Sequence, residues 1–290
     1  MAEKLPGEKT LNTGLTIPLF SDIYLKIEPV STSGGRYPTS RLQKGLILIS
    51  NGQELAEEGV GFGVPLLKMG VKTIFPGRIE LACFNEGPFQ IITAKFFMNL
   101  EERFKSQGPG NVKSRLLYWI KDHLADLYRR FPPSRRPLMA LSNAVRTSFD
   151  WQTTFVDAGC NLEVKVNYSI DPETGVIMVD VDAAGVSKAG VTEVILMNEQ
   201  GAHHFDTYFD SNGSSLKGEK IGSWEEVTAE NASFLSSTHR LAFTLQQANG
   251  ARLFRGRELV GSRLAWSGFG YSLPPASQRF AYRLRIERPA

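Results

Sequence analysis

Cysteine is scarce in this sequence, and long apolar runs are absent. The 290 residues include two cysteines, Cys83 and Cys160, which excludes a disulfide-rich scaffold and a cysteine-based zinc site. We predict that both are reduced, buried thiols. No run approaches the roughly 20 apolar residues of a membrane-spanning helix, and the polar first ten residues lack the apolar stretch of a signal peptide. We therefore expect a cytoplasmic protein without a membrane span.

A large excess of charge of one sign is also missing. The chain has 33 Lys and Arg against 30 Asp and Glu, a net charge of +3, which is too small to indicate a nucleic-acid partner. The basic excess lies within residues 101–150, which hold ten basic and five acidic residues. Its densest part is a corner around Pro132-Pro133, which either meets an anionic partner or is solvated. The corner consists of Arg129, Arg130, Arg135 and Arg136.

Local motifs that would identify a reaction are absent as well. The sequence has no Gly-x-Ser-x-Gly, no Walker loop, no His-Glu-x-x-His and no Cys-x-x-Cys. Gly59, Gly61 and Gly63 superficially resemble a phosphate-binding loop, but Val64-Pro65 follows, where a dinucleotide site needs the start of a helix. We predict close backbone packing at these glycines. The sequence therefore predicts no cofactor and no metal site, and leaves open whether the protein is an enzyme.

The pattern that is present has a period of two. Apolar and polar residues alternate between Leu162 and Tyr168 and between Ile177 and Val181, which is typical of half-buried strands. Asn51-Gly52, 171–175 and Asn212-Gly213 are turn signals between such stretches. Further strands are predicted at 15–20, 23–29, 45–50, 73–75, 78–84, 89–97, 192–197, 203–209, 240–245, 259–266 and 280–286.

One segment has a helical period instead. Leu116, Ile120, Leu124 and Leu127 recur every three or four residues, which predicts helices within 113–130 and 136–146. We predict a mainly β (α+β) fold, a large antiparallel β-sandwich or barrel-like assembly of about a dozen strands with a helical hairpin insertion. The expected organisation is one β-rich unit over 1–290, with β halves at 1–98 and 151–290 and the helical insertion at 99–150.

The segment 203–210 is the first candidate for chemistry. If it is a strand, His204, Asp206 and Tyr208 share one face, because successive residues point to opposite sides. A histidine and a carboxylate on one face suit proton transfer. Residues 206–210, Asp-Thr-Tyr-Phe-Asp, resemble the His-Thr-Tyr-Phe-Asn stretch of sugar mutarotases of the galactose mutarotase type, with Asp206 at the position of the catalytic histidine. The resemblance covers five residues, lacks an upstream substrate-arginine motif, and implies a β-sandwich able to handle sugars.

The second candidate lies in 253–259. Arg255 and Arg257 would share a strand face, and arginine forks suit carboxylate, phosphate or sulfate groups. Glu258 either neutralises them or acts as an acid or base. Glu58, beside the glycines, is a further candidate acid or base, and Trp266 is a candidate platform for a sugar ring, although core packing is the alternative.

We hypothesise that the protein binds or transforms a carbohydrate or other polar or anionic small molecule by acid–base chemistry. One alternative is a lipocalin-like protein that holds an apolar small molecule, favoured by the 18 phenylalanines, with or without isomerase or hydratase activity. Another is a non-catalytic interaction protein that docks through its helical insert. The oligomeric state is not predicted. The candidate catalytic residues are His204, Asp206, Glu58 and Glu258, and the candidate ligand-binding residues are Arg255, Arg257, Trp266 and Tyr208. We expect His204, Asp206, Arg255 and Arg257 to line one polar concavity.

Overall fold

The chain divides into two compact units. A computed structural model describes residues 9–11, 13–30, 42–70, 72–106, 151–186, 189–260, 264–274 and 279–289. Residues 1–100 and 158–290 form one unit, and residues 101–157 form the other. Of the second unit, residues 101–106 and 151–157 are described, and they belong to two long strands. The division at 98/99 and 150/151 stays a prediction.

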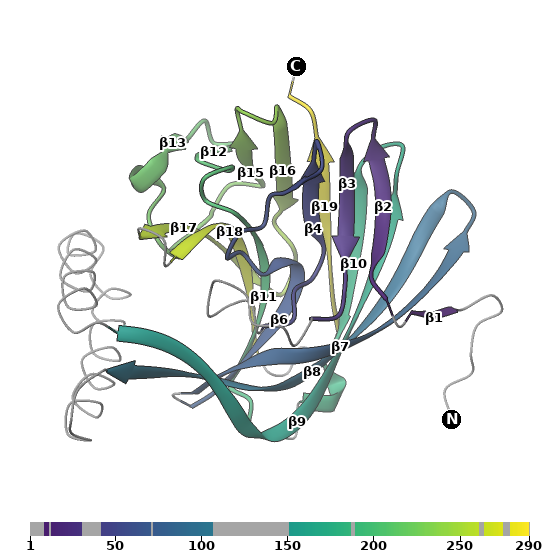
Figure 1. Cartoon of the computed structure of the whole chain (residues 1–290). Helices are drawn as coiled ribbons and strands as arrows, with labels where there is room; N and C mark the ends of the chain where they lie inside the picture. Colours follow the sequence, from purple (N-terminus) through teal and green to yellow (C-terminus); the bar gives the residue numbers. More distant parts are fainter. Residues whose placement is uncertain are drawn as a thin grey trace. The chain divides into compact units, whose positions relative to one another are not determined.

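Antiparallel strands make up most of the described chain (Figure 1), which confirms the prediction of a mainly β protein. In order they are β1 (Lys9–Leu11), β2 (Leu15–Phe20), β3 (Ile23–Ile27), β4 (Ile47–Ser50), β5 (Gln53–Glu54), β6 (Gly61–Met69), β7 (Lys72–Glu86), β8 (Phe89–Ser106), β9 (Trp151–Asp171), β10 (Val176–Asp182), β11 (Glu193–Gln200), β12 (Thr207–Asp210), β13 (Ser215–Lys217), β14 (Glu225–Glu226), β15 (Asn231–Ser236), β16 (Leu241–Gln246), β17 (Arg252–Val260), β18 (Leu264–Leu273) and β19 (Arg279–Glu287). Helical structure in the described residues is limited to the 3-10 turns η3 (Ala184–Val186) and η4 (Gly218–Ile221).

These strands form one large sheet and one small sheet. The large sheet has the order β13-β12-β15-β16-β19-β10-β9-β8-β7-β6-β11-β18-β17-β14, with β1 paired to β7, and the small sheet has the order β2-β3-β4-β5. The barrel-like alternative is therefore wrong for the described strands. Closing a barrel needs hydrogen bonds between the first and last strands, whereas the short strands β13 and β14 remain edges.

The strand before the predicted insertion is longer than expected. β8 continues to Ser106, so residues 99–106 are strand rather than part of a helical insertion. The reason is that the alternation of buried side chains at Ile92, Ala94, Phe96 and Met98 carries the strand past its expected end at residue 97. The helices predicted within 113–130 and 136–146, with Leu116, Ile120, Leu124 and Leu127, lie outside the described residues, as does the arginine corner.

The strand predicted over 259–266 is also wrong. β17 ends at Val260 and β18 begins at Leu264, and the two strands pair antiparallel, with Leu259 opposite Ala265. The apolar residues before and after this point belong to two neighbouring strands. The polar residues Gly261, Ser262 and Arg263 between them are a turn signal that the predicted strand ran through.

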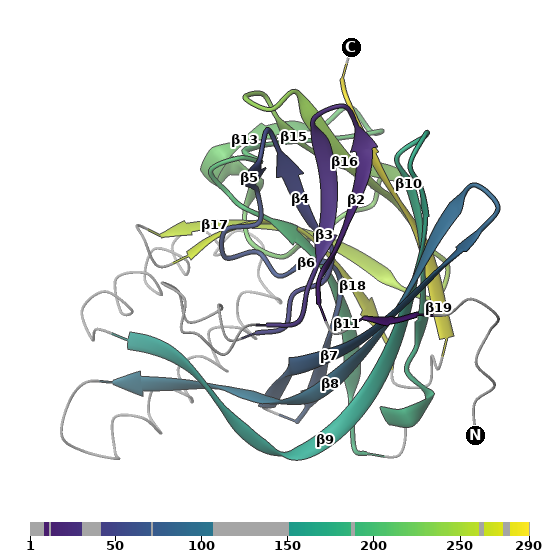
Figure 2. The same ribbon diagram turned by 45° about the vertical axis from the view of Figure 1, so that its right-hand side comes forward.

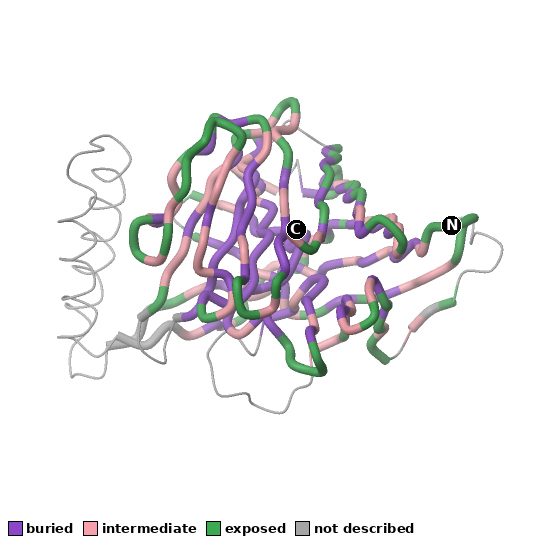
Figure 3. The backbone as a smooth tube through the Cα atoms, turned by 90° about the horizontal axis from the view of Figure 1, so that it is seen from above, coloured by how far each residue is buried: buried purple, intermediate pink, exposed green. Residues whose placement is uncertain are grey.

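The two sheets pack against each other through a filled core, as expected of a β-sandwich. Leu46 bridges to Phe62 of β6, and the buried Gln200 side chain of β11 accepts a hydrogen bond from the Leu48 backbone N–H of β4 at 3.2 Å. The views in Figures 1 and 2 agree that the small sheet lies beside β10 and β19. Phe243 packs edge-to-face on Phe205 and Phe62, so phenylalanines contribute to the core. Figure 3 shows that buried residues run along the strands and that the loops between them are exposed.

The two cysteines form no disulfide, as predicted, but neither is fully buried. Cys83 on β7 and Cys160 on β9 are partly exposed thiols. The prediction of burial fails because both lie on long strands where the side chains around them are also partly or fully exposed, including Glu86 and Asp157. Burial frequencies for cysteine describe an average environment, not these strand segments.

The hairpin between β9 and β10 provides a stability test. Gly175 has a positive φ of 68°, and a Cβ there would lie 2.2 Å from the Ile286 carbonyl oxygen. Gly213 has a similar φ of 82° but open space around it. We expect Gly213→Ala to cost about 1–2 kcal/mol through backbone strain alone, and Gly175→Ala to cost at least about 2 kcal/mol more, because the clash adds to the strain. Urea denaturation measures both, and equal losses would contradict the described register.

Candidate functional site

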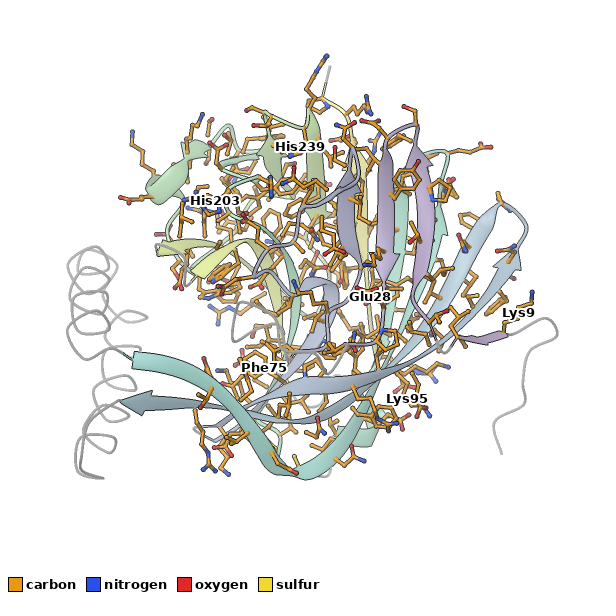
Figure 4. All side chains as sticks on the ribbon, viewed as in Figure 1. Lys9, Glu28, Phe75, Lys95, His203 and His239 are labelled. Carbon is orange, nitrogen blue, oxygen red and sulfur yellow. The ribbon has the colours of Figure 1, made fainter. Side chains whose placement is uncertain are left out.

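The two neighbouring histidines lie in a turn, not on a strand. Residues 202–204 form a turn in which the backbone N–H groups of His204 and Phe205 donate to the Gly201 carbonyl at 3.2 and 3.0 Å. β12 begins only at Thr207, so the predicted strand face containing His204 and Asp206 is wrong. The period of two holds within β12, where the Tyr208 hydroxyl donates to Asp210 at 2.7 Å. Figure 4 labels His203, which belongs to this turn.

The carboxylate of Glu57 contacts this turn directly. Its Oε1 lies 2.7 Å from His203 Nδ1 and 3.9 Å from His204 Nε2, and its Oε2 accepts the His203 backbone N–H at 3.2 Å. Glu57 has a left-handed φ of 47°, a conformation unusual for residues other than glycine and asparagine. A Cβ at Gly201 would lie 2.4 Å from the Glu57 carboxylate. The close approach of carboxylate and turn therefore needs glycine at position 201.

Arg257 reaches the same turn from β17. Its Nη2 donates to the Ala202 carbonyl oxygen at 3.0 Å, and its backbone N–H donates to Gly222. Its charge interacts with the carboxylates of Asp206 and Glu57, while burial lowers the pKa of the guanidinium. We call Glu57, His203, His204, Asp206 and Arg257 the His–Arg cluster. The structure thus brings together three of the four residues expected to share a concavity.

Arg255, the fourth, points the same way but has other partners. It lies two residues before Arg257 on β17, pairs with Glu225 at 2.8 Å, and stacks 4.6 Å above the Tyr208 ring. Tyr208 is fully buried and contacts Phe234 and Phe269. Arg255 therefore covers the aromatic core beside the cluster. The ligand-binding role of Tyr208 stays a prediction, and its complete burial argues against direct contact with a ligand.

Glu258 and Trp266 lie on the opposite face of β17 and β18 from Arg257. Successive strand residues alternate in direction, and Glu258 is in register with Trp266. The Ser223 hydroxyl donates to Glu258 Oε1 at 3.0 Å. Trp224 stacks on Trp266 with ring centroids 4.9 Å apart, which leaves the Trp266 side chain 8% exposed. The predicted site residues are therefore divided between two faces.

Buried acids extend this second face. Burial raises the pKa of Glu199 to about 8, and the negative charge of Glu258 acts in the same direction. Burial also raises the pKa of Glu58 to about 7, although the Lys44 ammonium opposes the shift. Among the residues that the structure describes, neither Glu58 carboxylate oxygen has a hydrogen-bond partner. Lys44 interacts with both Glu58 and Glu199, and burial lowers the pKa of its ammonium group. Because their pKa values are raised to about 7 and about 8, the carboxyl groups of Glu58 and Glu199 change protonation near neutral pH.

Sequence reasoning missed three residues of the site. They are Glu57, Glu199 and His239, none of which the sequence patterns single out. His239 Nε2 lies 3.2 Å from His204 Nδ1, and the two rings meet edge-to-face. Glu199 lies in a polar run, Asn198 to Gln200, that directly follows the apolar residues 194–197 of the same strand. That run was a usable signal, because polar groups that continue a buried strand need partners. His239 gave no signal, because 35 residues separate it from His204 in the chain.

A cavity among the described residues lies away from this cluster. It has a volume of about 590 Å³ and is open to solvent. It includes none of the predicted site residues. Its lining consists of Thr192, Glu193, Gly250, Ala251, Arg252, Ser272, Leu273 and Pro274. Over the described ranges, no group of three or more His, Cys, Asp or Glu side chains is arranged to hold a metal ion, and no described helix has the length and apolar character to cross a membrane.

Comparison with known proteins identifies the fold but no family. Neither a family model nor a curated protein sequence matches this chain. Two structures of the α-N-acetylgalactosaminidase NagBb from Bifidobacterium bifidum, in complex with Gal-NHAc-DNJ and with GalNAc, match 94% and 95% of the chain at 10% and 11% identity, each with a TM-score of 0.50. The chain spans 36% of the length of that enzyme. A galactose mutarotase-like protein from Lactobacillus casei covers 94% of the chain and 99% of its own length at 11% identity, with a TM-score of 0.37.

Proposed function

We propose that this protein binds a neutral, hydroxyl-rich small molecule of the carbohydrate class at the His–Arg cluster, and exchanges protons with it there. The observation that carries the proposal is the convergence of donors and acceptors from three chain segments. Glu57, the turn at 203–206 and Arg257 of β17 meet around one backbone turn. Sugars are recognised by such mixed sets, because each hydroxyl both donates and accepts a hydrogen bond.

The charges around Arg257 favour a neutral ligand over an anion. Its guanidinium interacts with three carboxylates, those of Asp206, Glu57 and Glu219. An added phosphate or carboxylate would meet this negative surrounding and would be repelled. A hydroxyl group, in contrast, can accept from the guanidinium and donate to a carboxylate. Of the polar or anionic ligands expected from the sequence, the polar uncharged ones therefore suit the cluster better.

Proton exchange would use His204 with the carboxylates beside it. Burial lowers the pKa of the His204 imidazole, although Glu57 acts in the opposite direction. A histidine that is neutral at pH 7 can act as a base or donate a hydrogen bond. Asp206 is partly exposed, with Oδ1 accepting from Thr207 at 2.9 Å. His204 and Asp206 keep the acid–base roles expected from the sequence as part of this proposal.

The fold is consistent with a ligand of this class. The enzyme NagBb contains a part with a similar fold, and its name and ligands concern N-acetylgalactosamine. Identities of 10–11% over 36% of that enzyme carry no residue role to this chain. The sugar ligand of NagBb therefore serves only to choose the first compounds to test.

Calorimetric titration with three ligand panels tests the binding. The panels are neutral mono- and disaccharides, sugar phosphates, and medium-chain fatty acids. We expect binding from the neutral panel and at least about tenfold weaker binding from sugar phosphates of the same sugar, since a charged group adjacent to three carboxylates is repelled. Tighter binding of a sugar phosphate or of a fatty acid would refute the proposed ligand class.

Arg257→Ala tests the position of the site. A hydrogen bond to a charged group contributes about 1.5–3 kcal/mol, so the affinity for the sugar should fall by roughly 10- to 150-fold. Arg252→Ala is the matched control, because Arg252 is exposed on the same strand and pairs with Glu226. We expect the control to bind as the native protein does. Equal affinity in both variants, with folding verified by thermal melting, would show that the ligand binds outside this cluster.

A further inference from the structure

His239 lies behind His204, on the side away from Glu57. It belongs to the turn between β15 and β16, where its backbone N–H donates to the Ser236 hydroxyl at 3.3 Å. Its Nε2 lies 3.2 Å from His204 Nδ1, while His204 Nε2 lies 3.9 Å from Glu57 Oε1. His204 is thus held between a second imidazole and a carboxylate. Figure 4 labels His239 in the same part of the molecule as His203.

The carboxylate decides which nitrogen of His204 carries the proton. Glu57 accepts hydrogen bonds and cannot donate them when ionised. It already accepts the His203 backbone N–H, and its Oε1 lies 2.7 Å from His203 Nδ1. A His204 Nε2–H directed toward this oxygen is favoured electrostatically, whereas a bare Nε2 would place a lone pair against a negative oxygen. In a neutral His204, Nδ1 must then be the acceptor, and the hydrogen bond to it must come from His239 Nε2–H.

We propose that His239 is a positioning residue that donates from Nε2 to His204 Nδ1, and so holds His204 in the tautomer with the proton on Nε2, beside Glu57. The benefit of this tautomer for ligand binding rests on the proposed function. The 3.9 Å between His204 Nε2 and Glu57 Oε1 is too long for a hydrogen bond. A ligand hydroxyl between them accepts from the imidazole and donates to the carboxylate. His239 thereby determines that the cluster offers one donor and one acceptor side by side.

Two substitutions at position 239 separate hydrogen bonding from packing. His239→Gln keeps an N–H donor near the position of Nε2, whereas His239→Phe keeps a ring and removes the donor. The imidazole rings of His204 and His239 meet edge-to-face with centroids 5.1 Å apart, a contact that phenylalanine preserves. A purely structural role would therefore be met at least as well by phenylalanine as by glutamine. Thermal melting of each variant shows whether the fold is retained.

Nitrogen NMR of the imidazoles in the ligand-free protein is the deciding measurement. At pH 8 we expect His204 to be protonated at Nε2 and bare at Nδ1 in the native protein and in His239→Gln, and to become a mixture of tautomers in His239→Phe. A native His204 protonated at Nδ1, or a tautomer unchanged by phenylalanine, would overturn the proposal. If phenylalanine unfolds the protein, the native spectrum and that of His239→Gln still decide it.

Sugar binding gives the second readout. His239→Phe should weaken binding roughly 3- to 10-fold, as expected for one misdirected neutral hydrogen bond, and His239→Gln should restore most of the loss. The NMR result does not depend on a ligand. A confirmed tautomer with no sugar binding would therefore refute the proposed function alone, whereas sugar binding with the wrong tautomer would refute the role of His239 alone.

Discussion

Glu199→Gln is expected to change the pH dependence of stability. Burial raises the pKa of Glu199 from 4.5 to about 8 in the folded protein, so the folded state keeps a proton that the unfolded chain releases above pH 4.5. Stability then falls as pH rises, by up to about 1.4 kcal/mol per pH unit for one proton. This contribution is complete below pH 4.5 and is lost by about pH 8. Glutamine does not titrate, so the variant should lack the decline.

The measurement is urea denaturation at intervals from pH 5 to pH 9. Because an amide oxygen still accepts the Val60 N–H that Glu199 binds at 3.3 Å, the variant should be more stable than the native protein at pH 8 by on the order of 4 kcal/mol. Glu163→Gln is the control, since Glu163 is exposed and pairs with Lys95 at 3.5 Å. Parallel curves for native protein and Glu199→Gln would show that Glu199 ionises normally. Glu58, whose pKa burial raises to about 7, should contribute a second decline of the same sign.

Asn198→Ala is expected to be strongly destabilising. Asn198 is fully buried on β11, and its Oδ1 accepts from the Gly63 backbone N–H at 3.1 Å and from the Tyr282 hydroxyl at 2.7 Å. Alanine leaves two buried donors without this acceptor, and each orphaned group costs about 1–3 kcal/mol. We therefore expect a loss of roughly 2–5 kcal/mol in the free energy of unfolding, measured by chemical denaturation.

Asn212→Ala is the matched control for this effect. Asn212 is exposed in the turn after β12, where its backbone N–H, not its side chain, donates to Asp210. The change should stay within about 0.5 kcal/mol of the native stability. A loss below about 1 kcal/mol in Asn198→Ala would mean that water or a neighbouring side chain replaces the lost acceptor, and that Asn198 does not fix the register shift between β6 and β11.

The strands and turns were largely predictable because their signals are local. The strand predicted over 15–20 coincides with β2, and the Asn51-Gly52 and Asn212-Gly213 signals are the turns after β4 and β12. Alternation and turn residues act over a few neighbouring positions, so one sequence contains all the information that they need. The predicted strand at 259–266 failed because it joined the apolar ends of two neighbouring strands across the turn residues Gly261 and Ser262.

The sequence predicted that His204 and Arg257 lie together, but it predicted part of the geometry wrongly. His204 and Arg257 do meet at the turn that contains Ala202, yet His204 lies in that turn rather than on a strand. Glu258 was grouped with Arg257, although adjacent strand residues face opposite sides. The pairing with Glu57 depends on its left-handed backbone and on Gly201, neither of which has a recognisable sequence pattern.

The sequence by itself determined that this chain is a mainly β, turn-rich protein, since period-two alternation and Asn-Gly turns are properties of neighbouring residues. It also supplied the residue types of the candidate site. Only the tertiary structure decided which of them meet. Glu57, His204, His239 and Arg257 are separated by 147, 35 and 18 positions in the chain, and are brought together by the pairing order of β11, β18 and β17 and by two turns. Burial is likewise a property of the packed sheets, so the raised pKa of Glu199 and the unpartnered Glu58 carboxylate arise only when the sandwich forms.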